Sequence, residues 1–190
     1  MCGRYTLFSY EEYQDLRRII ELAQQKAAGV PVKTGVVSPT DLAPVILGYG
    51  GKAVVHTAAW GFPGYGGKGV IINARAETAA EKSLFRQALL SSRCAVPATG
   101  FYEWNRVKEK YLFRLPQNEE LYLAGLWQTF DGQRRYTILT TEPNESVRPV
   151  HSRMPVILPK AMVRTWLSDP DAASELLRSP QPELTKKQEP

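Results

Sequence analysis

The chain has 190 residues, of which 43% are hydrophobic and 23% charged, enough to build the core of one globular domain. It holds no apolar run of about 18 residues and no basic-then-apolar start, so we expect no membrane span and no signal peptide. Two cysteines and two histidines exclude a disulfide framework and a zinc site, and we expect a cytoplasmic monomer without metal or cofactor. The net charge of +5 permits a polyanionic partner without requiring one.

The clearest predicted helix covers residues 9–29. Ser9 followed by Glu12 matches a capping box at its start, and Gly29 is a stop signal at its end. Apolar residues recur between these ends at helical spacing, which predicts one buried face. They are Tyr13, Leu16, Ile20 and Ala23.

The remainder of the chain is predicted to be rich in strands. Residues 44–60 have the pattern of a hairpin around a glycine-rich turn, and short strands are expected at 69–73, 111–115, 121–127 and 135–141. Helical segments are expected within 77–93, 160–167 and 171–179. We predict one α+β domain over residues 1–178, with mixed or antiparallel strands curved into a barrel-like sheet flanked by short helices. Residues 179–190 are predicted to form a flexible tail.

Cys2 directly follows the initiator methionine, where a frayed chain end would expose its thiol to oxidation. Aminopeptidases remove Met1 when the next side chain is small, and Cys2 would then carry a free α-amine beside its thiol. The alternative is that Cys2 packs as an ordinary buried thiol at the start of a strand, which is the role that we expect for Cys94.

Three further stretches place polar side chains at the edge of apolar runs. Asn73, Arg75 and Glu77 are spaced by two, so an extended segment would present them on one face, unless they only mark a solvated strand end. Glu103 lies among aromatic residues, where desolvation would raise its pKa and suit it to general acid catalysis, although strand alternation could instead turn it outward. His151 is either a proton carrier near neutral pH or an ordinary loop residue.

Four motifs, in this order, resemble those of the SOS response-associated peptidase (SRAP) family, whose members shield abasic sites in single-stranded DNA. They are Met-Cys-Gly-Arg at residues 1–4, Asn-Ala-Arg-x-Glu at 73–77, Gly-Phe-Tyr-Glu-Trp at 100–104 and His-x-Arg-Met-Pro-Val at 151–156. The similarity extends from Met1 to the region of Leu167. Two departures are visible: Ser152 stands where the family usually has Asp, and the glycine-rich loop after Trp60 lacks the family's second tryptophan.

The resemblance implies the SRAP fold and covalent capture of abasic sites in the DNA damage (SOS) response. A ring-opened abasic site is an aldehyde, which the α-amine of Cys2 would attack to give a Schiff base. The α-amine has a pKa of about 8, compared with about 10.4 for lysine, so more of it is neutral at pH 7. The adjacent thiol would then close a five-membered thiazolidine, a reaction that its intramolecular position favours.

The resemblance also implies roles for individual residues. Glu103 would shuttle protons, Asn73 would hold the amine or the sugar, and His151 would bind the opened sugar oxygen. The implied contacts with single-stranded DNA are Arg4, Arg75 and Arg153 for phosphates, Pro39, Trp60, Phe85 and Trp104 for bases, and Thr141.

Two other functions stay open at this point. The chain could be a thiol peptidase, either one with other substrates or one limited to its own N-terminal residue, with Cys2 as nucleophile and Glu103 or His151 as base. Such an enzyme needs an oxyanion hole and a substrate cleft, and the sequence indicates neither. A non-covalent module for single-stranded DNA is the other alternative, and it leaves the position of Cys2 unexplained.

Overall fold

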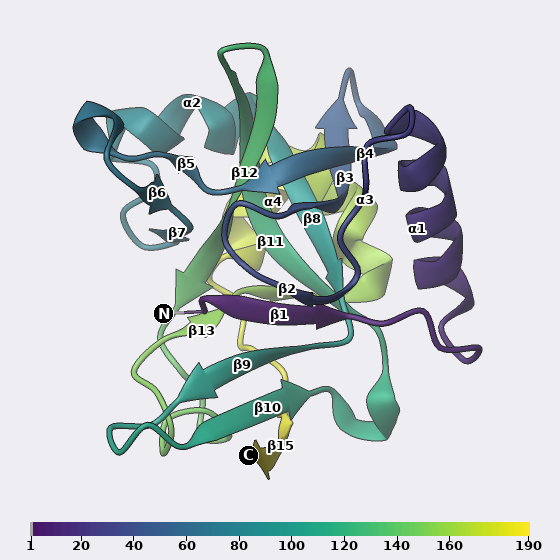
Figure 1. Cartoon of the computed structure of the whole chain (residues 1–190). Coiled ribbons are helices and arrows are strands. Elements are labelled where there is room, and N and C mark those ends of the chain that lie inside the picture. The colour runs from purple at the N-terminus through teal and green to yellow at the C-terminus, as the bar shows by residue number, and fades with distance from the viewer. Residues whose placement is uncertain (1) are drawn as a thin grey trace.

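The computed structural model describes residues 2–190 and shows a single α+β domain (Figure 1). Its centre is a closed ring of strands in the order β12–β4–β3–β8–β11, with β11 pairing back onto β12. The neighbours in this ring are antiparallel except for β12 and β4, which are parallel. The predicted barrel-like sheet is therefore confirmed. The ring strands are β3 (Leu42–Tyr49), β4 (Lys52–Trp60), β8 (Arg93–Ala98), β11 (Leu121–Phe130) and β12 (Gln133–Thr141).

The β3–β4 hairpin was predicted from its turn, and the structure confirms it. Gly50 and Gly51 connect the two strands with φ angles of 55° and 74°. Positive φ at both central positions is the requirement of the tight turns whose twist matches that of paired strands, and glycine meets it without steric cost.

A second sheet lies beside the barrel and carries the N-terminal strand. Its order is β15–β10–β9–β1–β2, and the neighbours are antiparallel. Figure 1 shows β1 lying between β2 and β9. The strands are β1 (Arg4–Leu7), β2 (Gly35–Val37), β9 (Gly100–Trp104), β10 (Lys110–Arg114) and β15 (Thr185–Glu189).

The prediction of a flexible tail over residues 179–190 is wrong for its last part. Residues 185–189 form β15, which pairs along the whole of β10 and covers the edge that this strand would otherwise expose. The side chains of β15 are largely exposed, and that polarity is the reason the sequence resembled a solvated tail. The strand is held by main-chain pairing and by Leu184, which is buried just before it.

Short helices surround the barrel. They are α1 (Gln14–Lys26), α2 (Ser83–Ser91), α3 (Val163–Ser168) and α4 (Pro170–Leu176), with single turns η1 (Tyr65–Gly67), η2 (Pro116–Asn118) and η3 (Lys160–Met162). The apolar face predicted for α1 is buried, but the predicted capping box at Ser9 is not formed, because the helix begins only at Gln14. Residues before it instead form a turn in which the ring of Tyr10 stacks on that of Phe8.

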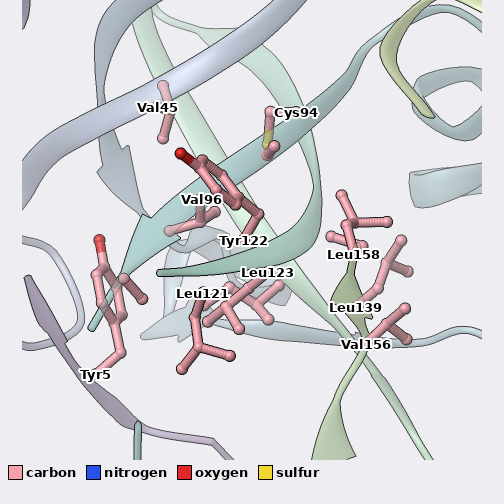
Figure 2. Packing of buried hydrophobic residues seen from close by; sticks show 14 of the residues in the cluster. Tyr5, Val45, Cys94, Val96, Leu121, Tyr122, Leu123, Leu139, Val156 and Leu158 are labelled. Atoms are coloured by element: carbon pink, nitrogen blue, oxygen red, sulfur yellow. The ribbon is translucent and has the colours of Figure 1, made fainter. Parts of the chain in front are cut away.

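The core is filled from both sheets. Figure 2 shows buried side chains from β1, β3, β8, β11 and β12 packed together with Leu158 of the short strand β14 (Ile157–Leu158) and with Val156, which lies between β14 and the short strand β13 (Met154–Pro155). Cys94 is among them and is fully buried, as expected for a structural thiol. None of the helices in residues 2–190 is long and apolar enough to cross a membrane.

Candidate functional site

Asn73 is positioned by an excursion of the chain after β4. Strand β4 ends at Trp60, and the chain then forms a small hairpin of β5 (Phe62–Pro63) and β6 (Val70–Ile71) before it returns as β7 (Asn73–Arg75). Strand β7 pairs with β12 in the same parallel sense as β4, a few residues further along. Gly61 allows this exit, because its φ is 112° and a Cβ there would lie 2.7 Å from that of Val70.

The start of the chain is fastened to β7. The side-chain amide Nδ2 of Asn73 donates a hydrogen bond of 2.9 Å to the backbone carbonyl of Cys2. The Cys2 side chain has 0% exposure, and its Sγ lies 3.9 Å from the carbonyl oxygen of Arg4. Burial, together with the nearby Glu103 carboxylate, raises the pKa of the Cys2 thiol far above its ordinary value, so the thiol is protonated at neutral pH. The state of Met1 lies outside the described residues.

Glu103 faces the interior of the molecule from β9. Alternation along this strand turns Phe101 and Glu103 to one face and Tyr102 and Trp104 to the other. Glu103 is only 2% exposed, and this burial raises the pKa of its carboxyl group to about 7. The carboxyl group can therefore both donate and accept a proton at physiological pH.

His151 completes the group of polar side chains. Its Nε2 lies 3.7 Å from Oε2 of Glu103, and the backbone N–H of Arg153 donates to its Nδ1 over 3.1 Å. Partial burial lowers the pKa of His151, which keeps the ring neutral at pH 7. The His151 side chain is 23% exposed, so it lies in contact with solvent on one side and with the buried Glu103 carboxyl group on the other.

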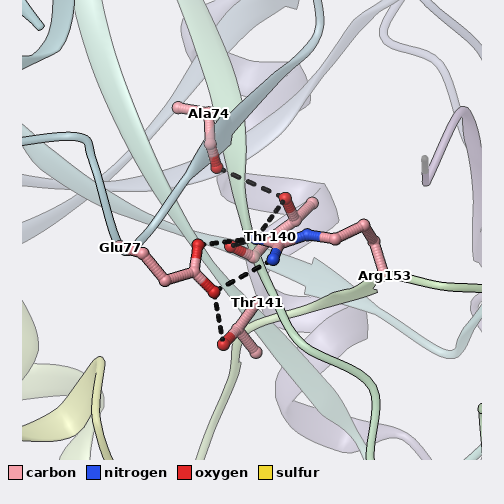
Figure 3. Close-up of polar contacts among 5 residues, drawn as sticks. All are labelled: Ala74, Glu77, Thr140, Thr141 and Arg153. Carbon is pink, nitrogen blue, oxygen red and sulfur yellow. Dashed lines mark hydrogen bonds and ion pairs between the residues drawn. The ribbon is translucent and has the colours of Figure 1, made fainter.

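A polar network fixes the segment that carries His151 (Figure 3). Both terminal nitrogens of Arg153 bond the carboxylate of Glu77, at 2.8 and 3.0 Å, and one of them also bonds the carbonyl of Thr140. Thr141 donates to the same carboxylate. Partial burial acts to raise the pKa of Glu77, but the hydrogen bonds from Arg153, Thr141 and its own backbone, together with the charge of Arg153, outweigh burial and lower that pKa.

The predicted common face of Asn73, Arg75 and Glu77 is therefore only partly correct. Asn73 and Arg75 lie on β7, but Glu77 lies in the turn that follows and is aimed at Arg153. The strand ends at Arg75 because its pairing with Thr140 of β12 is the last in the ladder.

The three arginines expected at phosphates differ in their surroundings. Arg75 is exposed on β7. Arg4 is half-buried and places its guanidinium 5.2 Å from the centre of the Trp104 ring, a cation–π contact. Arg153 is held by Glu77, so a phosphate there would have to compete with an ion pair that is already formed.

The apolar residues expected to contact DNA bases also differ in how far they are exposed. Trp60 is 0% exposed, its Nε1 donates to the carbonyl of Ile72, and its ring packs against those of Tyr5 and Tyr136. The expectation that Trp60 stacks on a base is therefore wrong, because it is a core residue with no free face. Phe85 packs its half-buried ring against Phe62. The remaining candidates, Pro39, Trp104 and Thr141, are all partly exposed.

The site therefore joins four distant segments: the N-terminus, β7, β9 and the loop before β13. The family described as SOS response associated peptidase (SRAP) matches residues 1–188, which include all of these segments. The chain belongs to the SRAP family. The match includes residues 185–188 of β15, so the terminal strand belongs to the family's domain up to that point.

Relatives of this chain carry a common description. The abasic site processing protein YoqW of Bacillus subtilis is 37% identical over 196 residues, covering 94% of this chain and 87% of its own. The abasic site processing protein YedK of Escherichia coli is 26% identical, with 88% and 79% covered. The abasic site processing protein HMCES of Xenopus tropicalis is 32% identical over 123 residues, which is 50% of this chain and 37% of that protein.

Solved structures show that the fold itself is shared. A protein from Bordetella bronchiseptica has a TM-score of 0.77 at 23% identity and covers 100% of both chains. A protein from Bacteroides thetaiotaomicron has a TM-score of 0.78 at 21% identity, covering 98% of this chain and 91% of its own.

The two departures from the family's motifs lie on the surface of this SRAP domain. Ser152 is exposed beside His151, and the glycine-rich loop after Trp60 forms the β5–β6 hairpin with η1 at its tip. Sequence reasoning missed the partner that Glu77 provides for Arg153, since an ion pair across 76 residues leaves no local pattern.

Proposed function

We propose that this protein captures abasic sites in single-stranded DNA by a covalent bond to Cys2, as part of a DNA damage response. The observation that carries the proposal is the placement of Cys2. Its carbonyl is held by Asn73, and its thiol lies close enough to Glu103 for that carboxylate to act on the thiol's pKa. The names of relatives such as YoqW, which describe abasic site processing, support the same function.

The reaction needs the free α-amine that removal of Met1 would create. The neutral amine attacks the aldehyde carbon of the ring-opened sugar and forms a C–N bond and a carbinolamine. Loss of the hydroxyl group as water gives the imine, and addition of the Cys2 sulfur to the imine carbon closes the thiazolidine. One water molecule leaves in all, the ring nitrogen keeps one of the two protons of the amine, the thiol proton replaces the proton that leaves with the hydroxyl group, and no oxidant or cofactor is consumed.

Glu103 suits both proton transfers in this sequence. In its protonated form it gives a proton to the departing hydroxyl group, and the carboxylate so formed then accepts the proton of the Cys2 thiol. A pKa of about 7 makes both forms available, whereas an exposed carboxylic acid would be almost fully ionised. The thiol is protonated before the reaction because it is buried, so the amine acts first and the sulfur second.

Asn73 and His151 have positioning roles in this mechanism. Asn73 holds the Cys2 carbonyl and so fixes the direction of the attacking amine. His151 is neutral, and its Nε2 lies beside Glu103, where it orients the carboxyl group and meets the opened sugar oxygen. The Glu77–Arg153 pair fixes the loop that carries this histidine, so we assign Arg153 first to that task.

The DNA strand would follow the outer surface around this site. Arg75 and Arg4 are placed to contact phosphates, and Trp104, braced by Arg4, offers a partly exposed indole ring for a base. Pro39, Phe85 and Thr141 are proposed as lesser contacts. A thiol peptidase is less well supported, because a buried Cys2 thiol with a raised pKa carries little of the thiolate that acts as nucleophile.

The test separates the amine from the thiol. The protein is incubated with a 15-nucleotide strand that contains one abasic site, and products are resolved on a denaturing gel with and without borohydride. Wild-type protein should give a heat-stable adduct without reduction, and mass spectrometry should find Cys2 as its first residue. Cys2→Ser and Cys2→Ala should give an adduct only after reduction, because they form the imine but no thiazolidine.

Cys94→Ala is the matched control, since it removes the other buried thiol and should leave the adduct unchanged. A variant with one residue added before Cys2 should give neither product. A heat-stable, unreduced adduct from Cys2→Ala would show that another residue makes the bond, and the proposal would then be wrong.

A further inference from the structure

A groove opens beside the reacting groups on the side of the β9–β10 hairpin. It has a volume of about 810 Å³ and is lined by residues 104–107 at the end of β9 and residues 148–152 before β13. His151 and Trp104 are both part of its lining, so the groove borders the site described above. The functional roles assigned so far use those two residues and none of the others.

The charge of the groove is positive. Its lining includes Arg106 and Arg148, and among the described lining residues none is acidic. Arg148 is 62% exposed and pairs with Glu145, itself 81% exposed, over 3.3 Å, a contact that water screens strongly. The other large pocket, of about 710 Å³, includes Glu12, Glu119 and Glu120 in its lining, so positive charge is particular to the groove beside the site.

The hairpin wall of the groove has a fixed shape. Oδ1 of Asn105 accepts hydrogen bonds from the backbone N–H groups of Val107 and Glu109, and its Nδ2 donates to the Glu109 carboxylate over 2.6 Å. These contacts close the turn in which Lys108 has a φ of 65°. The turn presents the Arg106 side chain to solvent and leaves Val107 74% exposed, so a cation and an apolar surface lie next to each other.

This combination of features suits a particular ligand. Guanidinium groups from two segments of one groove can each contact a phosphate of a flexible strand, and the exposed valine and the Trp104 indole ring offer apolar surface to the faces of unpaired bases. We propose that the groove binds the single-stranded DNA that flanks the abasic nucleotide on one side. Phosphates of that flank contact Arg106 and Arg148, and the neighbouring base lies against Trp104 and Val107. This inference rests on the proposed function and adds a second binding region to it.

Binding to intact DNA tests the groove without any covalent chemistry. Affinity for an undamaged 15-nucleotide strand is measured by fluorescence anisotropy between 50 and 200 mM salt, for wild type and for the double variant Arg106→Gln/Arg148→Gln. Two lost phosphate contacts should reduce the slope of log K against log salt by about 1.4 and weaken binding roughly tenfold at the lowest salt concentration. The matched control is Arg18→Gln/Arg178→Gln, which removes two exposed arginines outside the groove and should leave the slope unchanged.

Crosslinking to shortened strands then tests the one-sided placement. The abasic nucleotide is placed second from the 5′ end, second from the 3′ end, or in the centre of a trimer. The groove variant should slow capture roughly tenfold on one of the two end-placed strands and leave the other and the trimer at the wild-type rate. Equal loss on all strands, or an unchanged salt slope, would overturn the groove proposal. Absence of any adduct with wild-type protein would overturn the proposed function alone, because the anisotropy result stands independently.

Discussion

At the scale of single residues, the site depends on groups whose burial changes their chemistry. Glu103 is buried between two sheets and has a pKa near 7, and Cys2 is buried beside it with its thiol protonated. Neither state would exist on an exposed surface, where water stabilises the charged carboxylate and leaves the thiol near its ordinary pKa. The fold therefore holds a proton donor and a latent nucleophile together.

The pH dependence of capture should reveal Glu103 directly. In wild type the capture rate should rise with pH as the α-amine, whose pKa is about 8, loses its proton. The rate should fall again above pH 7–8 as Glu103 ionises. Glu103→Gln should lower the rate by about 10²–10⁴-fold and remove the alkaline decline. Single-turnover crosslinking between pH 6 and pH 9.5 measures the rate and its alkaline decline in both proteins. If the decline persists in Glu103→Gln, the ionisation of another group causes it.

The same carboxyl group should cost stability at high pH. Its pKa rises from 4.5 to about 7 on folding, so the folded state binds the proton more tightly than the unfolded state does. The unfolding free energy therefore falls as pH increases between these values, by up to about 3 kcal/mol. Relative to wild type, Glu103→Gln should be more stable at pH 8 than at pH 5. Denaturant unfolding of both proteins at both pH values decides this, and an equal difference at each pH would contradict it.

At the scale of elements, short strands and turns set the positions of these groups. Strand β7 continues the parallel pairing that β4 begins on β12, and this brings Asn73 to the start of the chain. The turn after β7 carries Glu77 to Arg153, and Arg153 in turn holds the ring of His151 through its backbone.

Breaking the ion pair between Glu77, in the turn after β7, and Arg153, in the loop before β13, should affect catalysis more than stability. Glu77→Gln removes a bidentate ion pair that is only partly buried, and we expect a loss of about 1 kcal/mol in the unfolding free energy. The rate of capture should fall several-fold because His151 loses its fixed support. Glu145→Gln, which removes the exposed pair with Arg148, is the control and should change stability by less than about 0.5 kcal/mol. Equal effects of the two changes on stability and capture would argue against a positioning role for Glu77.

The terminal strand should stabilise the second sheet. Removal of residues 184–190 would uncover the edge of β10 and the site occupied by Leu184, with an expected cost of about 2 kcal/mol. Amide hydrogen exchange at residues 110–114 should become faster at the same time. Removal of Pro190 alone is the control, and unchanged exchange in the longer truncation would show that β15 adds little to the sheet.

At the scale of the whole molecule, a net charge of +5 supports binding to a polyanion only where the cations are accessible. Several arginines are already engaged inside the protein. Arg93 is buried and donates to the backbone carbonyls of Leu89, Leu90 and Leu167, which joins the ends of α2 and α3 to the barrel. Arg75 differs in being exposed beside the site.

Arg75 should therefore contribute to binding of any single strand. Arg75→Ala should weaken binding to intact and abasic strands alike and lower the salt slope by about 0.7, the value for one phosphate contact on a single strand. Arg18→Ala on α1 should have no such effect. Anisotropy titrations at several salt concentrations test this, and an unchanged slope for Arg75→Ala would place the DNA elsewhere.

The sequence by itself determined the local elements and the family. The β3–β4 hairpin follows from Gly50 and Gly51 between two apolar runs, and the buried face of α1 follows from its spacing. The motifs at 73–77, 100–104 and 151–156 were sufficient to indicate SRAP membership and the identities of the polar residues. These features are readable because periodicity and turn chemistry act over a few neighbouring residues.

Only the tertiary structure decided which of these residues meet and which are accessible. Trp60 was predicted to contact a DNA base, but its ring is buried between Tyr5 and Tyr136. Residues 185–189 were predicted to belong to a flexible tail, but they pair with strand β10. Arg106 and Arg148 form one groove although each is an ordinary surface residue in its own segment. The physical reason is that burial and strand pairing depend on chain segments far apart in the sequence, so no local pattern contains them.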